Sequence, residues 1–136
     1  MRKYYLFNIK KEVYEYYKKN KHELYNNLKC LSKLKKEDFN HGVSLFHQLC
    51  EPFDVDLLNN YLIDKYKLIS YNGKFELKNT YIYLKSSRII VKTNVNLPGI
   101  FLDFKCYNRL IFVIDFEMKD YFFLCDSYNT NIYAYN

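Results

Sequence analysis

Glycine and proline are scarce in this chain of 136 residues, which contains three glycines and two prolines. Linkers between domains are typically rich in these residues and in serine, and no such stretch interrupts the sequence. No apolar run approaches the roughly 18 residues that a transmembrane helix needs. We therefore expect one soluble domain over residues 1–136, with a loosely held polar tail over about the last ten residues.

Features of exported proteins are also missing. The apolar run near the N-terminus ends in charge after a few residues, and no small-residue cleavage site follows, which is unlike a signal peptide. The four cysteines are spaced widely and irregularly, without a C-x-x-C pair. They are Cys30, Cys50, Cys106 and Cys125. We expect reduced, mostly buried thiols in a cytoplasmic protein.

No motif of a common enzyme class is present. The glycines are far apart, so there is no glycine-rich phosphate loop, and no G-x-S-x-G motif occurs. Asp115 and Glu117 flank Phe116 and could act together as acid and base. A strand end followed by a turn through Asp120 explains them more simply. We therefore expect a protein that is not an enzyme and uses neither a cofactor nor a small-molecule substrate.

The nearest approach to a metal site is formed by His41, His47 and Cys50. His47 and Cys50 are at positions i and i+3 and could share a helix face, and His41 lies almost two turns earlier. Structural zinc, however, takes four ligands at short, regular spacings. We interpret these residues as a polar edge beside a core cysteine, without a metal.

The net charge of +6 and the pI of about 9.0 make a basic nucleic-acid-binding domain an alternative function, beside another kind of small protein-interaction domain. Nearly all the positive charge is lysine, since the only arginines are Arg2, Arg88 and Arg109. The chain is also rich in Asn, Tyr and Ile, as the AT-rich codons of a low-GC bacterium would make it. Because coding bias can produce such a charge, we regard it as weak evidence and do not expect direct nucleic-acid binding.

Hydrophobic periodicity predicts a strand, several helices and then hairpins. The first half should form a strand over 3–9 and helices over 10–19, 22–34, 38–50 and after Asp54. The second half should form strands at 66–71 and 74–77 around an Asn72-Gly73 turn, strands at 81–85 and 88–93, a helix at 98–107, a central strand at 110–116 and a last strand at 121–125. Because the helices and strands are segregated, we expect an α+β fold in which helices pack against a largely antiparallel sheet.

The sequence also predicts which residues cap two of the helices and which face of one helix is buried. Asp38 and Asp54 precede helical segments and should act as N-caps. The helix after Asp54 should bury one apolar stripe. That stripe comprises Leu57, Leu58, Tyr61 and Leu62.

The helix at 10–19 carries more large side chains than one buried stripe can use. Val13, Tyr16 and Tyr17 fall close together on a helical wheel and predict the face toward the core. Tyr14 lies about 100° from Val13, between lysines, and should be exposed. Exposed aromatics rimmed by charge are typical of protein interfaces, because tyrosine offers a large contact area at low entropic cost. The alternative is that they only reflect a composition with sixteen tyrosines.

The two ends of the chain carry a family resemblance. Residues 4–17, YYLFNIKKEVYEYY, form a tyrosine-rich strand that runs into a lysine- and glutamate-rich helix bearing aromatic residues. Residues 111–116, IFVIDF, are followed after a four-residue turn by YFFL at 121–124. Together these segments resemble the start and the closing hairpin of the SirA family, the sporulation inhibitors of replication. Chain length and element order agree with that family.

This resemblance implies a protein that binds the N-terminal domain of the replication initiator DnaA and blocks initiator assembly at the origin. The family's contact surface includes aromatic positions on the first helix. Val13 and Tyr17 correspond to those positions, with Tyr14 and Tyr16 beside them. Val13 replaces an aromatic residue, and Phe123 stands where a tryptophan is usual. For Val13 and Tyr17 the implied contact role conflicts with the core role that the helical wheel predicts.

Overall fold

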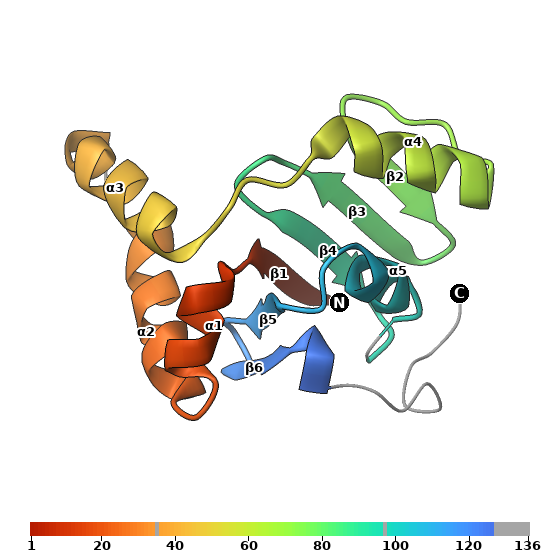
Figure 1. Cartoon of the computed structure of the whole chain (residues 1–136). Helices are drawn as coiled ribbons and strands as arrows, with labels where there is room; N and C mark the ends of the chain where they lie inside the picture. The colour runs from red at the N-terminus through yellow and green to blue at the C-terminus, as the bar shows by residue number, and fades with distance from the viewer. Residues whose placement is uncertain (35, 97, 127–136) are drawn as a thin grey trace.

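A computed structural model describes residues 1–34, 36–96 and 98–126, and within them five α-helices pack against an antiparallel sheet of six strands (Figure 1). The α+β fold class that the sequence predicts is thus confirmed. Of the expected tail, residues 127–136 lie outside the described part. None of the described helices is long and apolar enough to cross a membrane.

The observed elements follow the chain as follows. The strands are β1 (Arg2–Asn8), β2 (Lys74–Leu77), β3 (Thr80–Leu84), β4 (Ile89–Thr93), β5 (Ile111–Asp115) and β6 (Asp120–Phe123). The α-helices are α1 (Lys11–Tyr17), α2 (Lys21–Ser32), α3 (Phe39–Leu49), α4 (Val55–Tyr66) and α5 (Ile100–Tyr107). Two short 3₁₀ turns are η1 (Lys36–Asp38) and η2 (Leu124–Asp126).

The strand order in the sheet is β2-β3-β4-β1-β5-β6. The N-terminal strand β1 therefore lies inside the sheet, where it pairs with β4 on one side and with β5 on the other. The β2–β3–β4 meander and the β5–β6 hairpin extend the sheet from β1 in opposite directions. This arrangement brings the first strand and the last two strands of the chain together in one half of the sheet.

Alternate residues of β1 belong to two separate hydrophobic cores, because successive side chains of a strand point to opposite faces. Tyr4 and Leu6 belong to the core under α4 and α5. Phe7 and Ile9 belong to the core under α1, α2 and α3. In Figure 1, α1 and α2 lie beside β5 and β6 with α3 above α2, whereas α4 lies along β2 and β3. All of β5 is buried because helices cover both of its faces.

The other half of the sheet is covered on one face only. The buried residues of β2, β3 and β4 that form core clusters all join the core under α4 and α5. The side chains that alternate with these residues are exposed or half-buried, apart from the buried Ile90. Thr80 and Thr93 are buried at the strand ends on the core face, where their hydroxyls are hydrogen-bonded to each other. We call this uncovered face of β2, β3, β4 and the start of β1 the open face.

The expected strand over 66–71 is wrong. Tyr66 is instead the last residue of α4, and Lys67 ends the helix in a left-handed conformation with φ of 55°. Within that segment Tyr71 alone pairs, as an isolated bridge across the predicted two-residue turn. The helix extends this far because the Tyr66 hydroxyl donates a hydrogen bond to Asp103 of α5. This tertiary contact overrides the β propensity of the local sequence.

Asp103 of α5 forms hydrogen bonds with three residues of α4. Its carboxylate is buried and accepts hydrogen bonds from the Tyr61 hydroxyl at 2.7 Å, from the Lys65 ammonium and from the Tyr66 hydroxyl. Burial and then the bond to Asp103 raise the pKa of Tyr66. The hydrogen bond to Asp103 likewise raises the pKa of Lys65. The cluster fixes the packing of the two helices that cover one face of the sheet.

The two expected N-caps differ in outcome. The Asp54 carboxylate accepts a hydrogen bond from the Leu57 backbone N–H at 3.1 Å, which confirms it as the cap of α4. Asp38 makes no side-chain capping bond to α3. It ends the η1 turn with φ of −97° and ψ of 15°, outside the extended region that a capping residue usually adopts.

The expected apolar stripe of α4 is only partly buried. Leu58 and Leu62 lie in the core, as predicted. Leu57 is 54% exposed and Tyr61 is 40% exposed, so the stripe is narrower than its composition indicates. Tyr61 turns toward Asp103 with its hydroxyl rather than into the core.

Candidate protein-binding surface

The first helix is held in place by tertiary contacts, because its seven residues are too few for a stable isolated helix. Val13 is buried in the core beneath it. The Tyr14 ring packs edge-on against Phe123 of β6, with ring centroids 4.9 Å apart. The Tyr17 hydroxyl accepts a hydrogen bond from the Asn27 amide of α2 at 3.0 Å. β6 and α2 thus hold α1 from two sides.

Tyr14 is not fully exposed, against the expectation from the helical wheel. It is half-buried, and its hydroxyl and the Cys125 sulfur of η2 are hydrogen-bonded at 3.6 Å. This hydrogen bond, together with burial, raises the pKa of Tyr14 to about 12. The helical wheel predicts the exposure of Tyr14 wrongly, because it assumes that a helix packs on one face only. Here β6 and η2 cover a second side of α1.

Tyr16 differs from the other aromatic residues of α1, because its side chain is 70% exposed. Its expected place in the core stripe is therefore wrong. The ring packs edge-on against the outside of Tyr17, with centroids 4.8 Å apart, and not on the core. The Glu15–Lys18 ion pair, at 2.6 Å, adds charge to the exposed side of the helix. We call Tyr16 and the exposed part of Tyr17 the Tyr16 surface.

The structure separates the two roles that the sequence left in conflict. Val13 faces the core, as the helical wheel predicts, so its side chain is not available to a partner. Tyr17 is half-buried and combines both roles, since its hydroxyl is bonded to α2 while part of its ring remains accessible. Tyr16 presents the largest accessible aromatic area of α1.

The two carboxylates considered as an acid–base pair have different surroundings. Asp115 is buried at the end of β5, where it accepts hydrogen bonds from Arg2 Nε at 2.9 Å and from the Met118 backbone N–H at 3.1 Å. Glu117 is exposed in the turn that follows. Arg2 also contacts Asp120 of β6 at 3.2 Å. These contacts match the interpretation as a strand end and turn.

The three residues considered as metal ligands also lie in different environments. Cys50 is fully buried, and its burial raises the pKa of the thiol to about 12. Its backbone bridges to Ile9. His41 and His47 are exposed. Across the described part of the chain, no three or more His, Cys, Asp or Glu residues form a group that could hold a metal ion.

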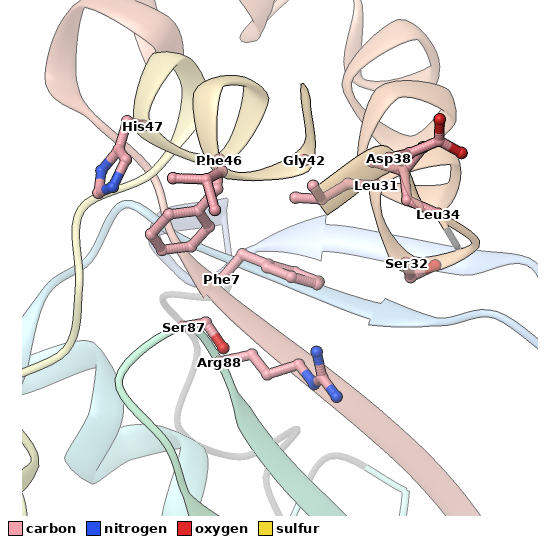
Figure 2. A pocket seen from close by; sticks show the side chains of 11 residues that line it. Phe7, Leu31, Ser32, Leu34, Asp38, Gly42, Phe46, His47, Ser87 and Arg88 are labelled. Atoms are coloured by element: carbon pink, nitrogen blue, oxygen red, sulfur yellow. The ribbon is translucent and has the colours of Figure 1, made fainter. Parts of the chain in front are cut away.

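An apolar cleft of about 430 Å³ lies between α2, α3, β1 and the β3–β4 turn (Figure 2). Phe46 of α3 approaches Phe7 of β1 from one side, and Arg88 lies on the other. Arg88 Nε is buried and has no hydrogen-bond partner among the described residues. The cleft was not predicted, because its walls come from segments far apart in the sequence.

Comparison with known protein families finds no family whose model matches this chain, and comparison with curated proteins finds no match either. The likeness of the terminal segments to the SirA family therefore rests on the residues quoted above.

Proposed function

We propose that this protein inhibits the initiation of DNA replication by binding the N-terminal domain of DnaA through the Tyr16 surface. The exposure of Tyr16 on a helix that is otherwise anchored is the observation that carries the proposal. The choice of partner follows from the resemblance of the terminal segments to the SirA family.

The spatial arrangement of those two segments supports the proposal. Residues 4–17 and 111–124 are far apart in sequence, but β1 pairs with β5 and β5 pairs with β6. The Tyr14–Phe123 ring contact joins α1 directly to the closing hairpin. The segments that carry the resemblance therefore form one structural unit, as parts of a shared binding surface should.

The Tyr16 surface has the physical properties of an interface anchor. Exposed tyrosines bury a large area on binding, and such residues are enriched among interface hot spots. The hydrogen bond between Tyr17 and Asn27 fixes the ring against which Tyr16 packs. Because the helix is already ordered, less conformational entropy is lost on binding than for a flexible segment.

Inhibition by such a protein requires occupancy of its partner and no chemical turnover. A bound domain of 136 residues would cover part of the initiator's N-terminal domain and obstruct its assembly at the origin. We therefore expect inhibition to be stoichiometric with DnaA and to disappear in parallel with binding.

The test is calorimetric titration of the purified DnaA N-terminal domain with wild-type protein, the Tyr16→Ala variant and the Tyr71→Ala variant. Tyr71 is 75% exposed and lies outside α1, so it controls for the loss of an accessible tyrosine. We expect Tyr16→Ala to weaken binding about 30-fold, as for a hot spot of about 2 kcal/mol. Tyr71→Ala should change the affinity less than about twofold.

Two results would contradict the proposal. One is the absence of binding by the wild-type protein at roughly 50 μM. The other is an equal loss of affinity in the Tyr16 and Tyr71 variants, which would place the contact away from α1. Circular dichroism of each variant would show that the fold is retained.

A further inference from the structure

The open face carries a row of alternating cationic and aromatic side chains. In the sheet register Lys74 of β2 lies opposite Tyr83 of β3, Tyr83 lies opposite Ile90 of β4, and Ile90 lies opposite Tyr5 of β1. Neighbouring strands are about 4.8 Å apart, so this row crosses roughly 14 Å of the sheet. Tyr83 and Tyr5 are half-buried and show part of their rings to solvent.

A second row runs parallel to the first, two residues further along each strand. Glu76 lies opposite Tyr81, Tyr81 lies opposite Lys92, and Lys92 lies opposite Lys3. Residues two apart on a strand point to the same face, so both rows belong to the open face. Tyr81 adds a third aromatic ring to that face.

The lysines of the open face lie close to its rings. The ammonium groups of Lys74 and Lys92 are 5.9 and 5.5 Å from the centroid of Tyr83. The ammonium of Lys3 is 5.1 Å from the centroid of Tyr5. A shallow hollow of about 260 Å³ is formed over Tyr83 and Ile90. The cationic residues that line this hollow are Lys3, Lys74, Lys85 and Lys92.

The open face is strongly positively charged. Arg88, whose guanidinium carbon is 5.8 Å from the centroid of Tyr5, adds a fifth cation to these four lysines. Glu76 is the acidic residue in the paired rows. Among the residues that the structure describes, none of the five cations forms an ion pair. Their charge is therefore available to an anionic ligand.

We infer that the open face binds single-stranded nucleic acid. Its cations are placed to contact phosphates, and Tyr5, Tyr81 and Tyr83 offer rings on which two or three unpaired bases can stack. The flexible lysine side chains can turn from the rings to the phosphates as the bases take their places. Lysine acts as a point charge and stacking tolerates every base, so little sequence preference is expected.

The aromatic rings distinguish this ligand from other anions. An acidic protein segment would satisfy the lysines but would make no particular use of three tyrosines on one face. Duplex DNA keeps its bases stacked inside the helix and presents no free ring to them. The open face shares no residue with the Tyr16 surface, so the two binding activities can be tested separately.

The test is fluorescence anisotropy with a labelled oligothymidylate of about twelve nucleotides, within the site sizes of known single-strand binders. An abasic oligonucleotide of equal length and polyglutamate serve as comparison ligands. With three to five phosphate contacts, we expect a salt slope of about −2 to −3.5. The affinity should then fall about 20- to 130-fold between 50 and 200 mM salt.

The variants separate charge from stacking. Lys74→Ala/Lys92→Ala should reduce the salt slope by about 1.4, whereas the control pair Lys19→Ala/Lys33→Ala, with lysines outside the open face, should leave it unchanged. Tyr83→Ala should weaken oligothymidylate binding about 5- to 150-fold. Tyr83→Phe keeps the ring and should retain binding, which would show that a loss in Tyr83→Ala is not caused by misfolding.

The inference would be overturned by the absence of oligothymidylate binding at 50 mM salt, or by binding of the abasic strand or of polyglutamate as tight as that of oligothymidylate. Equal weakening in the lysine pair and its control pair would show that only overall charge matters. Stronger binding of polyglutamate would identify an acidic protein as the ligand of this face instead.

Discussion

Replacing Asp103 with alanine tests whether one carboxylate holds α4 against α5. The side chain is 4% exposed and accepts hydrogen bonds from three residues, of which Lys65 is 48% exposed. Tyr61 is also accessible, so water can replace the acceptor for both residues, and each contributes no more than about 0.5 kcal/mol. The half-buried Tyr66 hydroxyl has less access to water, and its bond to a charged acceptor contributes about 1.5–3 kcal/mol.

These contributions predict a loss of about 2 kcal/mol in the free energy of unfolding for Asp103→Ala, because removal of the buried charge also relieves part of its desolvation cost. For a domain of this size, that loss corresponds to a decrease in Tm of roughly 8 °C. Urea unfolding followed by far-ultraviolet circular dichroism measures the change directly.

The matched control is Asp64→Ala, which removes an exposed aspartate from the same helix. It should change the free energy of unfolding by less than about 0.5 kcal/mol. Tyr66→Phe should reproduce part of the Asp103→Ala effect, about 1 kcal/mol. If Asp103→Ala costs no more than the Asp64 control, then the cluster does not hold α4 against α5 and the reasoning fails.

Three further predictions concern stability. Val13→Ala should lower the free energy of unfolding by about 2 kcal/mol and Tyr16→Ala by less than about 0.5 kcal/mol in urea titrations, and equal losses would refute their assigned burial. Burial raises the pKa of the Cys50 thiol from 9.0 to about 12, so its stabilising contribution is complete below pH 9 and is lost as the pH rises to about 12. The unfolding midpoint should therefore fall less steeply over that range in Cys50→Ala, and parallel profiles would contradict this. Gly73→Ala should cost about 1–2 kcal/mol, because φ is +74° and a Cβ would lie 3.0 Å from the Leu84 carbonyl oxygen; an unchanged thermal midpoint would exclude that strain.

Much of the fold was predictable because local patterns and tertiary packing agree. The strand that became β5 is a continuous apolar run, and the structure buries it on both faces. The Asp54 cap and the turn before β2 also follow from short sequence signals. In these segments the residue types that favour an element are also those that its neighbours require.

The errors arose where a distant residue decides the local structure. The local sequence predicts that Tyr66 begins a strand, but its hydrogen bond to Asp103 makes it the last residue of a helix. Tyr14 reads as exposed, but Phe123, more than a hundred residues later, covers one side of it. Neither partner could be assigned from local periodicity, since the topology of the sheet brings them together.

The open face was not predictable for a related reason. The alternation in β3 shows that Tyr81 and Tyr83 share a face. Which face the helices cover depends on where α1, α2 and α3 pack, and the sequence does not specify it. The net charge is likewise a property of the whole chain, whereas its concentration near β2–β4 depends on the strand order β2-β3-β4-β1.

Hydrogen–deuterium exchange of the protein with and without the DnaA N-terminal domain tests the central claim most directly. If the Tyr16 surface is the contact, binding should slow exchange in α1 and the adjoining start of α2, while α4 and α5 should exchange as in the free protein. Protection confined to α4 and α5, or no protection at saturating DnaA domain, would contradict the proposed function.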